Sequence, residues 1–312
     1  MAVYTQVPAE ALDAFLAGYN VGALVSAKGI AEGVENSNYL IDTTTARFIL
    51  TLYEKRVAEG DLPYFLALKT HLADRGLAVP RPIADRGGQT LQTLLRRPAC
   101  LIEFLPGVSL TEPTPAHCRA AGEALGRMHV AARDFTRVRE NALGLGGWRR
   151  LAEACGPRAD EIAPGLAAEI ADDLAFLEAN WPTSLDRATI HADLFPDNVL
   201  VRGTAVTGLI DFYFACTDIR AYDLAVMHTS WTFSADGATH YAGRALALDD
   251  GYAASHGLTP DEAAAMPILC RGACLRFLLT RTYDWLHTPA GARVTRKDPL
   301  ADRRRLAHYR AA

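Results

Sequence analysis

Hydrophobic and polar positions follow a short-period pattern in the first third of the chain. Brief apolar runs alternate with polar turns, first over 24–30, then over 38–42 and 47–53. Three consecutive runs of this kind predict an antiparallel meander of strands. The remaining elements expected in this part are strands at 90–95 and 99–105 and amphipathic helices at 8–19 and 61–76. The pattern therefore predicts a β-rich part that ends near residue 105.

The pattern changes to helical spacing after Pro106-Gly107. Helices are predicted over 114–133, 164–180 and 268–286, and the segment 141–156 is glycine-rich and predicts a loop. With 312 residues the chain exceeds the ~150 residues of a typical domain. We therefore expect an α+β protein with one domain over 1–105 and a mainly helical domain over 106–312.

Polar side chains that could take part in catalysis or bind a metal gather between residues 190 and 213. The sequence predicts a strand at Val199–Val201, a turn, and a second strand at Thr207–Ile210. A hairpin brings its ends together, so Asp193 and Asn198 would approach Asp211. Carboxylate and amide oxygens are the ligands that Mg²⁺ prefers, and one carboxylate remains for a substrate hydroxyl. The alternative is a surface loop in which Asp and Asn only form turns.

The spacing H-x-D-x-x-x-x-N followed by I-D-[FWY] stands here as His191, Asp193, Asn198 and 210–212. It resembles the catalytic and metal-binding loops of protein kinases, in the form found in the aminoglycoside phosphotransferase and choline kinase superfamily. The resemblance implies a two-lobed protein-kinase-like fold that uses ATP and Mg²⁺. It also implies that Asp193 is the catalytic carboxylate and that Asn198 and Asp211 bind the metal.

Neighbouring polar residues fit supporting roles. We expect His191 to hold the loop by packing and hydrogen bonds, because a general base must first satisfy geometry. Asp197 either binds a phosphate-associated metal or fixes the loop beside Pro196. Asp223 is expected to cap or bond to the catalytic loop, and His129 to have a packing or hydrogen-bonding role.

The nucleotide-binding residues are implied mainly by the resemblance. The turn from Gly29 to Asn38 lies where the superfamily holds phosphates, with candidates Gly33, Ser37 and Asn38, although any hairpin uses such residues. Thr51 stands in the third strand where kinase-like folds carry Lys or Arg. The adjacent Lys55 and Arg56 could substitute for that cation or form a solvated turn. Residues Glu103 to Leu105 are implied as the hinge that binds the adenine edge.

Composition narrows the class of protein. Half of the residues are hydrophobic and the net charge is −4, which gives no case for binding nucleic acid or a membrane. No apolar run is long enough to span a bilayer, and the start of the chain lacks the pattern of a signal peptide, so we expect a cytoplasmic protein. Six scattered cysteines without a Cys-x-x-Cys pair predict reduced core thiols and no zinc site.

Arginines in the apolar segment 268–286 bear on the substrate. Arg281 shares a face with Cys274 and Phe277, and a buried guanidinium needs an anionic partner. That partner is either an internal carboxylate, such as Asp284 or Asp223, or the substrate; snorkelling to the surface is a third possibility. Arg276 is a weaker candidate of the same kind. Trp231 is expected to line the substrate pocket.

The charge of the C-terminal region favours an acidic acceptor. From Cys270 onward there are ten Lys or Arg against three Asp. Polycationic aminoglycosides need the opposite sign, and choline needs an aromatic or acidic site. A basic pocket fits a substrate that carries a carboxylate, although a basic tail could also be only a solvated surface.

A closer resemblance covers nearly the whole chain. Its strings are 48–54, 191–199, 208–216, 221–225 and 275–286, and they look like the bacterial homoserine kinases built on the aminoglycoside phosphotransferase fold. This implies transfer of phosphate from ATP to L-homoserine, giving O-phospho-L-homoserine for threonine biosynthesis. The alternatives are a kinase of the same fold for choline, a sugar or an antibiotic, and an inactive nucleotide-binding module, which only Thr51 supports. The sequence predicts no oligomeric state.

Overall fold

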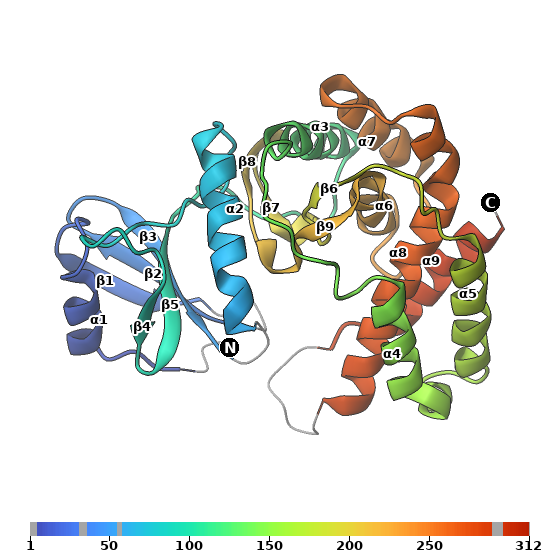
Figure 1. The fold of residues 1–312 in the computed structure, drawn as a ribbon, viewed down its shortest axis with the longest axis horizontal. Helices are drawn as coiled ribbons and strands as arrows, with labels where there is room; N and C mark the ends of the chain where they lie inside the picture. The colour runs from blue at the N-terminus through green and yellow to red at the C-terminus, as the bar shows by residue number, and fades with distance from the viewer. Residues whose placement is uncertain (1–4, 31–35, 55–57, 289–295, 312) are drawn as a thin grey trace. The chain divides into compact units, whose positions relative to one another are not determined.

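The computed structural model describes residues 5–30, 36–54, 58–288 and 296–311 (Figure 1). The chain divides into two compact units. The first contains Met1–Gly107 and Thr207–Tyr213, and the second contains Val108–Val206 and Phe214–Ala312. The first division falls two residues beyond the expected boundary of 105, and the sequence did not predict that the short segment 207–213 belongs to the first unit.

A five-stranded antiparallel sheet forms the centre of the first unit, with strand order β1-β2-β3-β5-β4. Its strands are β1 Leu24–Gly29, β2 Asn36–Thr43, β3 Arg47–Tyr53, β4 Gln92–Leu94 and β5 Arg97–Glu103. The helices of this unit are α1 Ala9–Leu16 and α2 Leu62–Asp74. The predicted meander and both predicted helices are confirmed. Leu12 and Leu16 of α1 pack against Ile41 and Leu50 of the sheet, which explains the amphipathic pattern of that helix.

Helices dominate the second unit. They are α3 Pro115–Ala131, α4 Leu145–Cys155, α5 Leu166–Asn180, α6 Arg220–Trp231, α7 Ala242–Ser255, α8 Pro260–His287 and α9 Pro299–Arg310. The chain also forms two short sheets: β6 Arg187–Ile190 pairs antiparallel with β9 Cys216–Ile219, and β7 Val199–Arg202 pairs with β8 Ala205–Leu209, whose last three residues are counted in the first unit. The predicted hairpin at 199–210 is therefore confirmed as β7 and β8. This mixture of an antiparallel sheet and a helical part confirms the expected α+β class.

The predicted loop over 141–156 is wrong, because α4 occupies most of it. The side chain of Trp148 is fully buried and its ring lies 5.0 Å from that of Trp181 in an edge-on contact. Burial of one large aromatic side chain outweighs the weak helix propensity of the glycines around it.

Helix α8 runs through the core of the second unit and begins earlier than predicted. Thr259 and Glu262 form a capping box that starts the helix at Pro260, and Pro267 is accommodated inside it. Among the described residues, α8 alone has the length and apolar composition of a membrane span. Just over half of its most apolar window is buried inside the protein.

Two glycines allow α3 and α7 to approach closely. A methyl group added at Gly122 would lie 2.2 Å from the carbonyl oxygen of Leu248, and one added at Gly251 would lie 1.9 Å from that of Arg119. Both distances are far below van der Waals contact, so these positions require glycine for packing. The α3–α7 pair in turn holds Tyr252 against His129, and His129 contacts Asp223, the residue that holds the loop described next.

Candidate active site

The loop from His191 to Asn198 follows β6 and is held by one buried carboxylate. Asp223, on α6, has no exposed surface. Its two oxygens accept the backbone N–H groups of His191 and Ala192, both at 2.7 Å, and one of them lies 3.0 Å from Nε2 of His129. His129 continues the chain of contacts to the Tyr252 hydroxyl at 2.9 Å. The predicted loop-supporting role of Asp223 and the hydrogen-bonding role of His129 are confirmed.

These contacts affect the charge state of Asp223. Burial acts to raise its pKa, but the hydrogen bond and charge of His129 and the contacts with His191 outweigh burial, so the pKa of Asp223 lies below its usual value. The carboxylate is therefore ionised at neutral pH and remains an acceptor for both loop N–H groups.

Ala192 adopts a conformation that alanine rarely takes. Its φ angle is +62°, in the left-handed region, which costs about 1–3 kcal/mol. Two contacts compensate for this cost: the N–H donates to Asp223, and the carbonyl oxygen accepts from Nη1 of Arg276 on α8. Strain that is held in this way turns the following residue, Asp193, out of the buried part of the loop; its side chain is 19% exposed.

Asp193 and Asn198 lie together within the loop. The amide nitrogen of Asn198 donates to the backbone oxygen of Asp193 at 2.8 Å and lies 3.3 Å from its carboxylate oxygen Oδ2. The amide group is thereby oriented, and its oxygen is the atom suited to bind a cation. The structure thus brings Asp193 and Asn198 together, while their predicted approach to Asp211 stays a prediction.

His191 is fully buried beneath this loop. Its Nδ1 lies 3.3 Å from the backbone nitrogen of Asp193, with the geometry of an acceptor. Trp231 is also fully buried, and its indole N–H donates to the carbonyl oxygen of Leu194 at 2.8 Å. Both side chains contact the loop backbone, and this placement favours a supporting role for Trp231 over contact with a substrate.

Asp211 belongs to the first unit, as do the predicted nucleotide-binding residues. Its side chain is exposed and its φ angle is +64°, again in the left-handed region. The hydroxyl of Thr51 donates to the side-chain oxygen of Asn38 at 2.8 Å. Ser37 is buried and donates to Glu54 at 2.7 Å. Glu103 is the last residue of β5 and Leu105 follows it; Gly33, Lys55 and Arg56 lie outside the described residues.

Sequence reasoning missed a buried lysine in the same unit. Lys69 of α2 is 3% exposed, and its ammonium lies 5.7 Å from the centre of the Tyr213 ring. Burial lowers its pKa, while Cys100 and Asp211 act in the opposite direction. Apolar spacing alone placed Lys69 on a helix, and only packing shows that it points inward beside the segment of Asp211.

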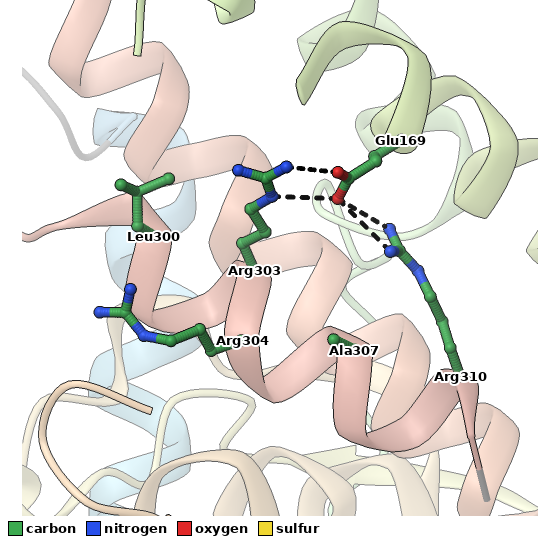
Figure 2. Close-up of a pocket in the computed structure, with 6 residues that line it drawn as sticks. All are labelled: Glu169, Leu300, Arg303, Arg304, Ala307 and Arg310. Carbon is green, nitrogen blue, oxygen red and sulfur yellow. Dashed lines mark hydrogen bonds and ion pairs between the residues drawn. The ribbon is translucent and has the colours of Figure 1, made fainter. Parts of the chain in front are cut away.

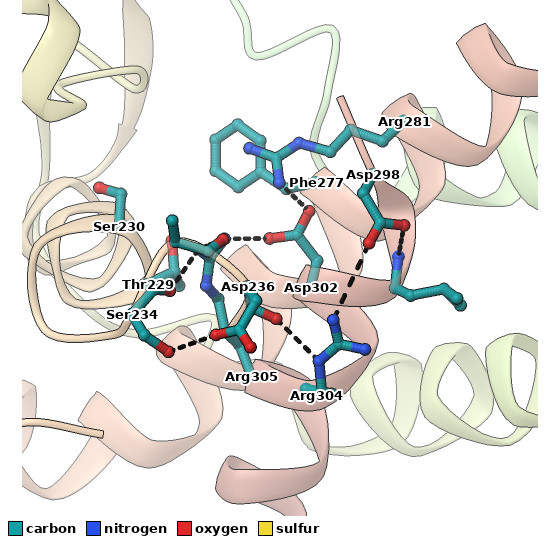
Figure 3. A network of polar contacts seen from close by, with 12 residues as sticks. Thr229, Ser230, Ser234, Asp236, Phe277, Arg281, Asp298, Asp302, Arg304 and Arg305 are labelled. Carbon is teal, nitrogen blue, oxygen red and sulfur yellow. Dashed lines mark hydrogen bonds and ion pairs between the residues drawn. The ribbon is translucent and has the colours of Figure 1, made fainter. Parts of the chain in front are cut away.

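Arginines of α8 lie close to the loop in the second unit. Arg276 is 2% exposed, and its Nη2 lies 3.8 Å from a carboxylate oxygen of Asp193. Arg281 forms an ion pair at 2.5 Å with Asp302 of α9, which is fully buried and also pairs with Arg305 at 2.7 Å (Figure 3). One interpretation of the sequence expected Asp284 or Asp223 as the partner of Arg281, and this was wrong: the partner is Asp302.

The electrostatics of this pair leave a positive excess. Burial raises the pKa of Asp302, and the charges of Arg281 and Arg305 oppose that rise. One buried carboxylate faces two guanidinium groups, so at least one positive charge remains for another anion.

A separate surface pocket lies between α5 and α9 of the same unit (Figure 2). It is lined by Glu169, Leu300, Arg303, Arg304, Ala307 and Arg310. Glu169 pairs with Arg303 and Arg310, Asp173 also pairs with Arg310, and Asp298 pairs with Arg304, so each arginine of this pocket already has a carboxylate partner. None of the predicted site residues lines this pocket.

The two predicted metal ligands, Asn198 and Asp211, belong to different units, so each is assessed by its own chemistry. No group of three or more His, Cys, Asp or Glu side chains able to hold a metal occurs among the residues the structure describes. Asn198 offers an amide oxygen and Asp211 a carboxylate, the oxygen donors that Mg²⁺ uses while it retains water and substrate phosphates. Each of these donors, taken in its own unit, has the oxygen chemistry that suits magnesium rather than zinc.

Comparison with known proteins identifies a matching family and similar sequences. Residues 26–263 match the model of the "Phosphotransferase enzyme family". The homoserine kinase of Methylorubrum populi is 55% identical over 312 residues, covering 100% of this chain and 97% of the relative. The homoserine kinase of Azorhizobium caulinodans is 53% identical over 311 residues, with 100% and 97% coverage.

Solved structures show the same fold at low sequence identity. An amicoumacin kinase in complex with AMP-PNP, Ca²⁺ and Ami has a TM-score of 0.68 at 14% identity, covering 98% of this chain and 92% of the other. The choline kinase of Cryptosporidium parvum has a TM-score of 0.70 at 15% identity, with 97% and 95% coverage. The expected protein-kinase-like fold is thereby confirmed.

Proposed function

Because this chain belongs to the phosphotransferase enzyme family, we propose that it is a homoserine kinase that transfers the γ-phosphoryl group of ATP to the hydroxyl of L-homoserine. The observation that carries this proposal is identity above 50% with curated homoserine kinases over the whole chain. A pathway follows from the product: O-phospho-L-homoserine serves threonine biosynthesis. We also propose a cytoplasmic location, in keeping with a soluble biosynthetic enzyme.

Asp193 is the proposed catalytic carboxylate. It orients the substrate hydroxyl and accepts its proton as the phosphoryl group transfers in line, without a covalent enzyme intermediate. The strained and doubly held Ala192 supports this role, because it fixes the direction of the residue that follows. Arg276, in contact with the same backbone, positions the loop and keeps a positive charge 3.8 Å from Asp193.

We propose that Asn198 and Asp211 hold the metal ion, through the amide oxygen of one and a carboxylate oxygen of the other. When bound, Mg²⁺ neutralises charge on the transferring phosphate. Its identity as magnesium rests on the oxygen donors and on the reaction class. For the nucleotide we propose the turn of Ser37 and Asn38, the strand residue Thr51, and the backbone from Glu103 to Leu105.

Arg281 is the proposed receptor of the substrate carboxylate. It is 13% exposed, and Asp302 neutralises it only partly, because Arg305 shares that carboxylate. A kinase for choline or an aminoglycoside would have no use for this positive excess. The charge of the site therefore supports an amino-acid acceptor over the cationic acceptors of other enzymes with this fold.

The test is release of ADP with Mg-ATP and one of four acceptors: L-homoserine, choline, L-serine or kanamycin. We expect turnover with L-homoserine and at most traces with the others. Turnover with a different acceptor would retain the reaction class but refute the substrate. No turnover with any acceptor, together with measurable ATP binding, would instead support an inactive nucleotide-binding module.

A further inference from the structure

A pair of aromatic rings beside the catalytic loop is surrounded by cations. The rings of Phe195 and Phe277 meet edge to face with centres 4.7 Å apart. Arg276 lies 4.5 Å from the centre of the Phe277 ring, and Arg281 lies 5.8 Å from that centre. On the other ring, the ammonium of Lys297 lies 5.5 Å from the centre of Phe195. Three cationic groups, two from α8 and one from the segment before α9, thus lie against this pair of rings, and Phe195 is two residues from Asp193.

The three cations differ in the hydrogen bonds and ion pairs that they already form with the protein. Arg276 is committed to the loop backbone, and Arg281 shares the buried Asp302 with Arg305 (Figure 3). Among the residues that the structure describes, the ion-pair partner of Lys297 is a surface carboxylate, Asp197, at 3.4 Å, with both side chains about 60% exposed. An exposed pair of this kind contributes little to stability, about 0–1 kcal/mol, so a ligand can open it at small cost.

The Lys297–Asp197 pair has the charges that a zwitterion requires. An α-amino acid carries one carboxylate and one ammonium on the same carbon, so it can exchange one protein–protein ion pair for two protein–ligand pairs. Arg281, with its partly neutralised charge, lies against the same two rings and adds a second cation on the carboxylate side. A substrate that lacks the carboxylate or the ammonium would lose the contact that the missing group makes.

The distances allow the other end of the substrate to reach Asp193. Phe195 is two residues from Asp193, so their Cα atoms are at most ~7.6 Å apart. A four-carbon hydroxy amino acid spans about 5 Å from carboxylate carbon to hydroxyl oxygen at bond lengths near 1.5 Å. Asp197 itself adjoins Asn198 in the short helix Pro196–Asn198, which places it on the same loop as the catalytic carboxylate.

We propose that Lys297 and Arg281 together bind the α-carboxylate of the substrate and that Asp197 binds its α-ammonium group. This inference rests on the proposed function, and it assigns the amino-group receptor that sequence reasoning left open. It makes Lys297 and Asp197 specificity-determining residues that admit amino acids and reject simple alcohols.

The experiment compares three variants with the wild-type enzyme on three acceptors. The variants are Lys297→Met, Asp197→Asn and, as a matched control, Arg296→Met. Arg296 is the neighbouring cation, but it lies 4.5 Å from the Trp285 ring and contacts that residue's carbonyl oxygen. The acceptors are L-homoserine, 3-aminopropan-1-ol, which lacks the carboxylate, and 4-hydroxybutyrate, which lacks the ammonium. Calorimetric titration with L-homoserine gives the same comparison without turnover.

Lys297→Met should lower the ratio of kcat/KM for L-homoserine over 3-aminopropan-1-ol about tenfold or more, chiefly through KM, because a charge-assisted contact is lost. Asp197→Asn should lower the ratio for L-homoserine over 4-hydroxybutyrate by a similar factor. The calorimetric Kd for L-homoserine should rise in both variants and stay unchanged in Arg296→Met.

Two failures are distinguishable. A wild-type enzyme that does not phosphorylate L-homoserine would refute the proposed function. An active wild-type enzyme whose Lys297→Met and Asp197→Asn variants bind L-homoserine with unchanged Kd would overturn this inference alone. Equal losses in Arg296→Met would also overturn it, because the effect would then reflect the general charge of the segment.

Discussion

At the scale of single residues, the loop depends on a backbone conformation that its own sequence does not favour. Ala192 is not a glycine, yet it occupies the left-handed region because Asp223 and Arg276 hold both sides of its peptide units. The proposed catalytic carboxylate, Asp193, is thus directed by residues 30 and more than 80 positions away. A site of this kind depends on such supporting contacts as well as on its reacting groups, because the contacts fix the geometry of those groups.

The first prediction concerns Asp193. Asp193→Asn should lower kcat about 10²–10⁴-fold, because the amide cannot accept the proton of the substrate hydroxyl. Nucleotide affinity, measured by calorimetry with ADP, should change little. Near-normal kcat in this variant would refute the assignment of the catalytic carboxylate.

A second prediction at this scale separates Asp223 from the reacting groups. Asp223→Ala leaves two buried loop N–H groups and His129 without their partner, so it should cost about 3–5 kcal/mol in the free energy of unfolding. Urea denaturation measures this loss. Asp223→Asn keeps the side-chain volume and one of the two acceptor oxygens, so it should lose less stability than the alanine variant. A stability change below ~1 kcal/mol in the alanine variant would contradict the supporting role.

At the scale of elements, glycine positions decide how closely two helices pack. The α3–α7 contact lacks room for any side chain at Gly251, where a methyl group would meet backbone atoms of Arg119. The same helix contains Gly243, where a methyl group would meet no atom within 4 Å. This gives a matched pair of substitutions within α7.

Gly251→Ala should therefore destabilise the protein by about 1–3 kcal/mol, because a packed interface must move apart. Gly243→Ala should be neutral or stabilising by up to about 1 kcal/mol, through helix propensity. Thermal unfolding of both variants tests the prediction. Similar melting temperatures for the two would show that the close helix contact does not determine stability.

At the scale of the whole molecule, buried carboxylates determine how stability depends on pH. Burial acts to raise the pKa of Glu262, but its hydrogen bonds from Arg220 and Thr259 outweigh burial and the pKa lies below 4.5; the pKa of Asp223 lies below 3.8. Groups with lowered pKa contribute stability that is present above their unfolded values and is lost as pH falls through their folded values. Asp302, with a raised pKa, contributes in the opposite direction.

We therefore expect the free energy of unfolding to fall progressively below about pH 4.5. Glu262→Gln should flatten part of this fall, because the carboxylate that accepts two 2.7 Å contacts from Arg220 no longer titrates. Urea denaturation between pH 3 and 7 provides the measurement. An unchanged acid slope in Glu262→Gln would show that this ion pair is not linked to acid unfolding.

The sequence by itself determined the elements and the chemistry of this protein. Apolar spacing predicted the meander, most helices and the β7–β8 hairpin, because both periods are local properties of the chain. The motif around Asp193 and Asn198 identified the reaction class, since metal and proton chemistry require those side chains at that spacing.

Only the tertiary structure decided which charges meet. It placed Asp302 against Arg281, Lys297 beside Phe195, and Lys69 inward beside the segment of Asp211. It also turned the glycine-rich segment around Trp148 into a helix. The physical reason is common to all four: pairing and burial depend on residues distant in sequence, and their free energies exceed the local preferences that sequence patterns record.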